Sequence, residues 1–335
     1  MTRRIPPIPA EPIVNRLAPL ACLALAALLP SCGQATVGSA DRPLKMFFVP
    51  SVDAETIALS ADQLVEHVER HVSQELYGAD EGFYVEYAIP TSYVAVVEAF
   101  GTGRADFAAI NTFSYILAKD VKKYPVAPVV RVVRGDGETS YKGQIIARAD
   151  SGIETIRDLE GRTFAYTDPA STAGYILASA LFEREGVKLG EATFASKHDN
   201  VVTKVYQGQV DAGATYYSPP ALEDGVERIR DARARVKTQF PDVEEKVRII
   251  GFTADAPNEP WIVRTDLYDD PAMQERVVDA IREALLSFAA TEEGRVALDE
   301  LYDITGLAPV DDSDYDQLRA LVLDTEVDLA SAVGG

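Results

Sequence analysis

Two patterns of apolar and polar positions alternate along the chain, and together they predict a succession of strands and helices. Residues 45–49 form a short apolar run, which is typical of a buried strand. Residues 61–76 carry apolar side chains at helical spacing, and Gly78 follows them as a helix terminator. Apolar and more polar residues alternate over 83–89, which indicates another strand. Because a helix and a strand continue this alternation up to residue 110, we expect a mainly parallel sheet with helices on its faces.

The second half of the chain repeats this order of elements. Strands are expected over 145–148, 163–166 and 212–216, and helices over 172–185, 201–206, from Asp270-Pro271 onward, and over 316–329. A helix, a glycine turn, an aspartate and a strand of small residues occur in the same order within 97–109 and within 203–214. In a chain of 335 residues, this short repeat favours two lobes of similar substructure.

The first 31 residues have the composition of an export signal. Three arginines precede or begin an apolar stretch over 17–29, which is too short to span a bilayer as a stable helix. Leu29-Pro30-Ser31-Cys32 resembles a bacterial lipobox, whose cysteine is lipidated and becomes the new N-terminus. We therefore expect a lipoprotein signal peptide over 1–31 and a flexible tether over 32–43. The alternative is a plain secretory signal that happens to contain Cys32.

Charge and cysteine content narrow the function classes. The formal net charge is −21, and removal of the signal, with three Arg and one Glu, makes it −23. Such an acidic chain argues against a nucleic-acid partner, which clustered Lys and Arg would bind. Cys22 and Cys32 are the two cysteines, so the mature chain has no internal disulfide and no thiol nucleophile.

The sharpest local motif covers residues 168–175, which read Asp-Pro-Ala-Ser-Thr-Ala-Gly-Tyr. It follows a predicted strand and opens a predicted helix. The free N–H groups at the helix start, with the hydroxyls of Ser171 and Thr172, could cradle an anion. The alternative is an ordinary Ser/Thr N-cap.

This motif resembles the D-P-x-S-T-[SA]-G-[YF] motif of phosphonate-type ABC solute-binding proteins. Residues 151–165 are similar to the segment that precedes the motif in that family. Other matching segments follow in family order: Tyr93, Asn111-Thr112-Phe113, residues 141–144, His198-Asp199, residues 208–211 and residues 257–261. The resemblance runs from about Phe47 to Tyr315, nearly the whole mature chain.

The resemblance implies a two-lobed α/β fold of the type II periplasmic-binding-protein class. Each lobe would be a mainly parallel sheet flanked by helices, with the ligand in the cleft between lobes. Lobe 1 would comprise 44–131 and 255–330, and lobe 2 would comprise 132–254. The lobes would close about hinge strands near 130–142 and 250–256. The partners implied are an ABC permease with its ATPase, and the membrane through Cys32, for an extracytoplasmic monomer without metal or cofactor.

Carried over position by position, the family's oxyanion pocket would use Tyr93, Tyr141, Ser171, Thr172, the amide of Ala173, and His198. Asn111, Tyr216 and Glu259 are added as candidate ligand-binding residues. An anion beside His198 would favour its protonated form. The alternatives are core or rim tyrosines and a structural histidine.

Two departures from the family bear on the ligand. Members that prefer aminophosphonates carry a glutamate where this chain has residues 214–220, with Ser218 or a tyrosine in its place. This favours a small amine-free anion such as phosphite, methylphosphonate or phosphate. The other departure is Glu259, where many members of the family have aspartate. We hypothesise that Glu259 accepts a hydrogen bond from a protonated P–OH and so rejects sulfate. The alternative is a loop acid that points to solvent.

Other functions have less support in the sequence. A secreted hydrolase would use Ser171, His198 and Asp199, but the G-x-S-x-G motif, a Walker loop and a dinucleotide fingerprint are all missing. We therefore expect no enzyme activity. His67 and His71 lie four residues apart on a helix, and we interpret them as a solvated structural face, not a metal site. A sensor that reports ligand to a membrane kinase remains an alternative to import.

Overall fold

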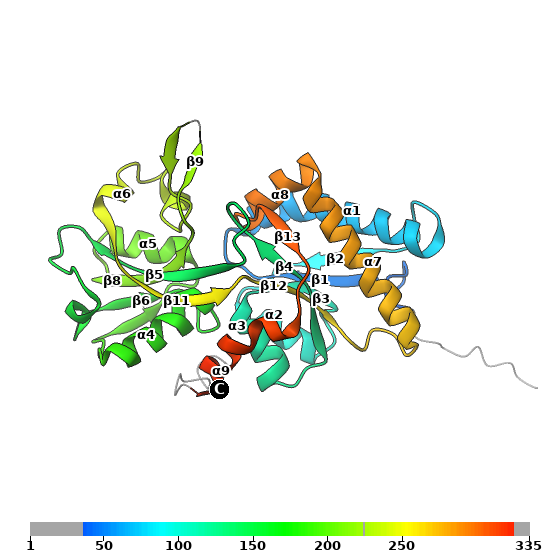
Figure 1. Ribbon diagram of the computed structural model, residues 1–335, viewed down its shortest axis with the longest axis horizontal. Helices are drawn as coiled ribbons and strands as arrows, with labels where there is room; N and C mark the ends of the chain where they lie inside the picture. Colours follow the sequence, from blue (N-terminus) through cyan, green and yellow to red (C-terminus); the bar gives the residue numbers. More distant parts are fainter. Residues whose placement is uncertain (1–35, 224, 325–335) are drawn as a thin grey trace, which may run out of the picture. The chain divides into compact units, whose positions relative to one another are not determined.

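The computed structural model describes residues 36–223 and 225–324, which form two sheets with helices on both faces of each (Figure 1). The expected signal peptide and Cys32 lie outside the described residues. No helix in the described ranges is both long enough and apolar enough to cross a membrane.

The first sheet and its helices form what we call the six-stranded lobe. Its strand order is β13–β4–β12–β3–β1–β2. The strands are β1 (Leu44–Phe48), β2 (Val85–Ala88), β3 (Phe107–Ala109), β4 (Val126–Val133), β12 (Pro260–Arg264) and β13 (Gly306–Ala308). One face packs on α1 (Ala54–Tyr77), α7 (Pro271–Ala290) and α8 (Glu292–Tyr302). The other packs on α2 (Tyr93–Gly101), α3 (Thr112–Ile116) with a π-helical turn (Leu117–Val121), and α9 (Asp316–Asp324) after a 3-10 turn (Asp312–Tyr315).

The second sheet and its helices form the five-stranded lobe. Its strand order is β11–β5–β8–β6–β7. The strands are β5 (Ser140–Arg148), β6 (Phe164–Tyr166), β7 (Ala192–Phe194), β8 (Ala212–Tyr217) and β11 (Val247–Pro257). A π-helical turn (Thr172–Ile176) leads into α4 (Leu177–Glu185), which covers one face, and α5 (His198–Tyr206) and α6 (Val243–Lys246) cover the other. Smaller elements are 3-10 turns (Ile156–Leu159 and Ala234–Val236) and a hairpin of β9 (Ala221–Glu223) and β10 (Val226–Arg228).

The two-lobed α/β architecture agrees with the sequence, but the sheets are mixed, not mainly parallel. In the six-stranded lobe, β1 pairs in parallel with β2 and β3, while β12 and β13 pair antiparallel with their neighbours. In the five-stranded lobe, β6 pairs in parallel with β7 and β8, while β5 pairs antiparallel with β8 and β11. The strands through which the chain enters and leaves each lobe are among those that pair antiparallel, because they run in the direction opposite to their neighbours.

Helix α1 shows how the apolar spacing becomes structure. Its buried face includes Ile57, Leu64, Val68 and Val72, which pack into the core beside the sheet. The helix ends at Gly78, whose left-handed backbone (φ 66°) donates its N–H to the carbonyl of Gln74. It starts at Ala54, seven residues before the predicted start, because a spacing argument detects the apolar face and not the first turn.

The segment expected to be a tether is in part folded. Val37 is buried in the core of the six-stranded lobe, and its carbonyl accepts a hydrogen bond from the Tyr268 hydroxyl at 2.7 Å. Gly38 lies directly against the ring of Phe83. A flexible tether over 32–43 is therefore wrong for residues 36–43, because small residues there allow close packing.

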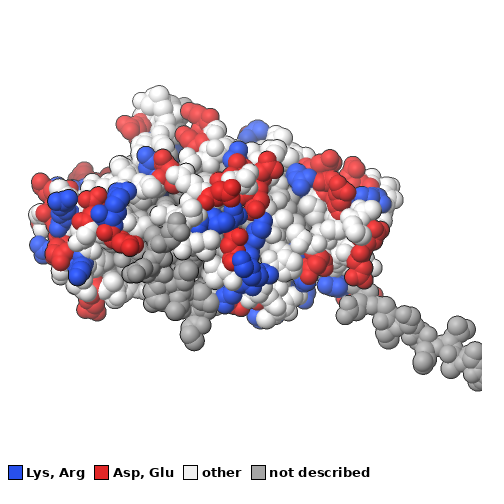
Figure 2. Space-filling model, turned by 60° about the horizontal axis from the view of Figure 1, so that its bottom comes forward, with Lys and Arg blue, Asp and Glu red and all other residues white. Residues whose placement is uncertain are grey.

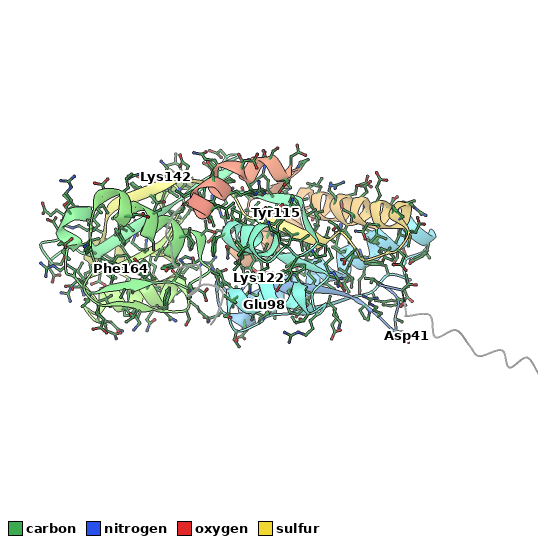
Figure 3. All side chains as sticks on the ribbon, turned by 90° about the horizontal axis from the view of Figure 1, so that it is seen from below. Asp41, Glu98, Tyr115, Lys122, Lys142 and Phe164 are labelled. Carbon is green, nitrogen blue, oxygen red and sulfur yellow. The ribbon has the colours of Figure 1, made fainter. Side chains whose placement is uncertain are left out.

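Charged side chains are distributed over the outside of both lobes. Figure 2 shows acidic and basic groups interspersed on the face it presents. The ion pair of Lys122 with Glu98, at 2.8 Å, joins the end of the π-helical turn to α2, and both residues lie together on the six-stranded lobe (Figure 3). Such partly exposed pairs contribute little to stability, but they fix local positions.

Two short segments carry the chain between the lobes. Residues 134–139 lead from β4 to β5, and Asn258 and Glu259 lead from β11 to β12. The buried Asn258 amide donates to the carbonyls of Val132 (2.9 Å) and Glu138 (2.8 Å), and its backbone N–H donates to Thr139 (2.9 Å). Asn258 therefore fastens the two crossing segments to each other.

Candidate functional site

A cavity of about 70 Å³ lies between the two lobes, beside the crossing segments. All nine residues that the sequence singled out as ligand-binding candidates line it: Tyr93, Asn111, Tyr141, Ser171, Thr172, Ala173, His198, Tyr216 and Glu259. The sequence did not single out Ser51, Arg134, Arg235, Tyr302 and Asp303, which line it as well. A concave site on which polar groups converge is a common ligand site.

The start of the π-helical turn supplies one wall of the cavity. Ser171 is the N-cap residue, and its Oγ accepts the Gly174 N–H at 3.1 Å, so its hydroxyl hydrogen stays available to donate. No hydrogen bond to another described residue is found for the N–H groups of Thr172 and Ala173, as expected of a helix start. Three donors thus converge here. Ser171 is therefore an N-cap residue, as the alternative predicted, and the anion cradle stays a prediction.

The Thr172 hydroxyl serves a different purpose. It accepts the Phe113 N–H at 2.9 Å and donates to Asn111 Oδ1 at 3.0 Å. Asn111 is itself the N-cap of α3, where its Oδ1 accepts the Ser114 N–H at 3.0 Å. The Thr172 hydroxyl therefore joins the two lobes, and the backbone N–H is the donor that this residue offers to the cavity.

His198 enters the cavity from the first position of α5. Its Nδ1 lies 3.1 Å from the Thr167 hydroxyl, which also lies 3.2 Å from the Ala214 carbonyl. Since a carbonyl only accepts, both contacts are satisfied when Nδ1 carries the hydrogen. Burial, with a smaller effect of Arg235, lowers the pKa of His198 to about 3. The ring is therefore neutral at pH 7 in this environment, and its Nε2 is an acceptor; protonation beside a bound anion stays a prediction.

The tyrosines line the cavity as neutral donors. Tyr93 and Tyr141 are buried, and burial raises the pKa of both phenols, with nearby Asp168 and Glu259 respectively adding to the shift. Tyr216 stands edge-to-face to His198, with ring centroids 5.0 Å apart. Burial also raises its pKa. All three phenols therefore keep their hydrogen at neutral pH.

Two arginine–carboxylate pairs complete the lining. Arg134 contacts both oxygens of Glu259, at 2.5 and 3.3 Å, and Arg235 contacts Asp303 at 2.7 Å. Glu259 does not point to solvent, but both of its oxygens are already engaged by Arg134. With His198 neutral, the charges of the lining residues cancel. The two arginines were missed because their partners lie 125 and 68 residues away, which no local motif reveals.

The hydrolase alternative fails on geometry. His198 Nδ1 contacts Thr167, not Asp199, and the buried Asp199 Oδ1 has no hydrogen-bond partner among the described residues. Burial raises the pKa of Asp199 to about 6. Ser171 is used as an N-cap. Consequently the three side chains do not form a nucleophile, base and orienting acid.

The histidines of α1 lie outside the cavity lining. His67 Nε2 is 3.0 Å from the Ser287 hydroxyl, and its ring packs on Phe288. His71 groups with Glu75 and Glu283, with ligand atoms within 4.8 Å of one another, and both glutamates are exposed. His67 thus has a structural role between α1 and α7.

Comparisons with known proteins agree with this architecture. The chain is 26% identical over 286 residues to the phosphate-import protein PhnD of Mycolicibacterium smegmatis, covering 81% of this chain and 82% of the relative. Among solved structures, PhnD1 of Prochlorococcus marinus in complex with methylphosphonate superposes with a TM-score of 0.68 at 15% identity, covering 84% of this chain and 97% of that one. A binding-protein component of an ABC phosphonate transporter from Pseudomonas aeruginosa gives a TM-score of 0.66 at 18% identity, covering 88% and 89%.

The family model for periplasmic substrate-binding proteins of phosphonate ABC transporters matches residues 46–315. These proteins bind and deliver substrates, which confirms the expectation of a protein that is not an enzyme. The chain therefore belongs to the family of periplasmic substrate-binding proteins of phosphonate ABC transporters.

Proposed function

We propose that this protein captures a small, amine-free phosphorus oxyanion (phosphite, an alkylphosphonate or phosphate) and delivers it to an ABC permease and its ATPase. The observation that carries the proposal is a small cavity of balanced charge with uncharged donors converging on it. The relatives support the ligand class, since one is a phosphate-import protein and another was solved with methylphosphonate.

Five groups are available to bind the oxygens of such an anion. The Ser171 hydroxyl and the amides of Thr172 and Ala173 stand at one wall. Ser218 adds a buried hydroxyl that has no hydrogen-bond partner among the described residues, and Tyr93 adds a phenol. An unpaired buried hydroxyl is costly, and a ligand oxygen would satisfy it.

The charged pairs support an amine-free ligand. A ligand ammonium group needs a carboxylate, but Glu259 is held by Arg134 and Asp303 by Arg235. An amine would have to share either carboxylate with the arginine that already neutralises it. An aminoalkyl phosphonate therefore binds less well than methylphosphonate or phosphite.

We assign to His198, in place of Glu259, the role of accepting a hydrogen bond from the ligand's P–OH group. Its neutral Nε2 can accept the hydrogen of a P–OH group, which monoprotonated phosphate and phosphonate carry and sulfate lacks. A ligand without that hydrogen would place an oxygen lone pair against the Nε2 lone pair. This repulsion supports discrimination against sulfate.

Closure about the two crossing segments would enclose the ligand. Asn258 fastens these segments together, and the Thr172 hydroxyl bonds to the opposite lobe at the cavity wall. Opening of the lobes breaks the contact of Thr172 and can preserve the contacts of Asn258.

We also propose that the protein is attached to the membrane through a lipidated Cys32, which lies outside the described residues. Mass spectrometry of the mature N-terminus tests this attachment.

A thermal-shift panel on the chain from residue 33 onward tests the ligand class. Phosphite, methylphosphonate, aminoethylphosphonate, phosphate and sulfate are compared at matched ionic strength. A ligand at a hundredfold excess over its Kd stabilises the folded state by about 2.7 kcal/mol. We expect this shift for at least one amine-free phosphorus anion and none for sulfate. A response to a sugar or an amino acid, with none to any phosphorus compound, would overturn the proposal.

A further inference from the structure

Arg235, Tyr216 and Asp303 form a closed triangle of contacts between the lobes. Arg235 donates to the Tyr216 hydroxyl at 3.2 Å and to Asp303 Oδ2 at 2.7 Å, and the Tyr216 hydroxyl lies 3.3 Å from the same carboxylate oxygen. All three line the cavity. Tyr216 and Arg235 belong to the five-stranded lobe, whereas Asp303 belongs to the six-stranded lobe.

Asp303 is held firmly in an unusual place. It is the C-cap of α8 in the left-handed conformation (φ 55°), with its N–H bonded to the Asp299 carbonyl at 2.8 Å. Glycine is the usual residue there, and a carboxylate at a helix C-terminus is repelled by the helix dipole. Leu298 and Leu301 of α8 anchor this end in the core. The structure thus keeps a carboxylate where neither backbone nor dipole favours one.

Arg235 is positioned from the opposite side. It lies in the short turn Ala234–Val236, and Val236 is buried in the core of the five-stranded lobe. Its side chain is 18% exposed, and Asp303 is its ion-pair partner among the described residues. If the lobes part, Arg235 can keep Tyr216, which is in its own lobe, but it must leave Asp303. Its charge then faces the open cleft.

Within residues 36–223 and 225–324, two further ion pairs cross between the lobes. Arg230 reaches the Asp299 carboxylate at 3.6 Å and the Asp303 carbonyl at 3.5 Å. Lys197, before α5, pairs with Asp53, before α1. These pairs are more exposed than the triangle, and screening by salt weakens them.

We propose that Arg235 and Asp303 form a latch that couples lobe closure to the charge of the cavity. In the open protein, Arg235 has lost its ion pair with Asp303 and attracts the anion. In the closed protein, Asp303 neutralises Arg235 and stabilises the contact between lobes, so the anion rests on uncharged donors. Asp303 is a positioning residue for Arg235 and need not touch the ligand. The attraction of the anion and its slow release rest on the proposed function, whereas the stabilisation of the closed state by the Arg235–Asp303 pair does not.

The test uses small-angle scattering of the ligand-free protein and stopped-flow release of phosphite, or of methylphosphonate if phosphite does not bind. In Asp303→Asn, the closed state would bury an unpaired Arg235. We expect a larger radius of gyration without ligand and release at least about tenfold faster. Asp266→Asn is the matched control, because Asp266 pairs with Arg264 inside the six-stranded lobe.

The double variant Arg235→Gln/Asp303→Asn separates a latch from a merely structural carboxylate. Removing the unpaired charge should return the radius of gyration toward the wild-type value. An unchanged radius in Asp303→Asn, or no recovery in the double variant, would overturn the latch. Because the scattering needs no ligand, it is independent of the proposed ligand class. If none of the phosphorus anions binds while the scattering results hold, the ligand class is wrong and the latch stands.

Discussion

The hydroxyl of Thr172 joins the two lobes at the wall of the cavity. It accepts from Phe113 and donates to Asn111, so both of its hydrogen-bonding functions are used within the protein. The sequence motif predicts instead that the Thr172 hydroxyl donates to an anion. The prediction differs from the structure because Phe113 and Asn111 lie 59 and 61 residues away from Thr172 in the sequence, and only the fold brings them near.

Replacing Thr172 with valine tests this contact. The substitution keeps the shape and leaves the buried Phe113 N–H and Asn111 Oδ1 each short of a partner. We expect the free energy of unfolding to fall by about 1–3 kcal/mol, measured by urea denaturation. Thr193→Val on the exposed strand β7 is the control and should change it by under about 0.5 kcal/mol. Equal effects of the two substitutions would contradict the assignment.

His198 makes stability depend on pH. Its pKa is about 3 in the folded protein and 6.5 in the reference state, so below pH 6.5 the unfolded chain binds a proton that the folded protein does not. The contribution of His198 to the free energy of unfolding is therefore complete above pH 6.5. As the pH falls from 6.5 toward 3, that free energy decreases by roughly 1 kcal/mol per pH unit. Asp199, with its pKa raised to about 6, acts in the opposite direction as pH falls from 6 toward 3.8.

Comparison with His198→Gln isolates the histidine, since Asp199 is present in both proteins. We expect urea midpoints of the wild type to fall more steeply than those of the variant between pH 6.5 and pH 4. Parallel curves over that range would show that burial does not suppress protonation of His198.

The sequence predicts that the nine candidate residues belong to one site, because they occur in the order of the family's motifs. It does not predict the individual role of each residue. Glu259 was recognised, but its engagement by Arg134 depends on how the crossing segments pack. The charge of the cavity follows from such pairs, and it decides which ligands are compatible.

At the scale of elements, apolar spacing indicates where strands and helices lie, but not which strands pair. The alternation of strand and helix favoured parallel sheets, whereas β4, β5, β11 and β12 introduce antiparallel pairing as the chain passes between lobes. Composition similarly suggested a flexible tether. The burial of Val37 shows that small polar residues can also be packed.

The Asn258 side chain and the Arg134–Glu259 pair join the two crossing segments. Asn258 is fully buried, and its amide donates to the carbonyls of Val132 in β4 and Glu138 in the other crossing segment. Asn258→Asp keeps the shape but replaces the donating amide nitrogen with a carboxylate oxygen, an acceptor that faces two carbonyl oxygens. We expect the free energy of unfolding to fall by about 3 kcal/mol, at the upper end for a buried polar mismatch. Amide hydrogen exchange should rise over residues 133–140.

Asn200→Asp is the control for this substitution. The Asn200 amide makes one partly buried bond, to the Ala195 carbonyl, within the five-stranded lobe. Its effect should be about 1 kcal/mol, without faster exchange over 133–140. If both variants behaved alike, Asn258 would not be a specific fastener of the crossing segments.

At the scale of the whole molecule, two lobes enclose a cavity whose net charge is balanced although the chain carries −21. The acidic groups are spread over the outside, as Figure 2 shows for one face. Selection of an anion by this protein therefore depends on directional donors and on one neutral acceptor, His198 Nε2, and not on an excess of positive charge.

Isothermal titration of phosphite, methylphosphonate, phosphate and sulfate into the wild type and His198→Ala at pH 7 tests the central claim most directly. The account predicts one-to-one binding of at least one phosphorus anion, no heat from sulfate, and loss of binding in His198→Ala. Sulfate binding as tightly as the phosphorus anions, or unchanged affinity in His198→Ala, would contradict it.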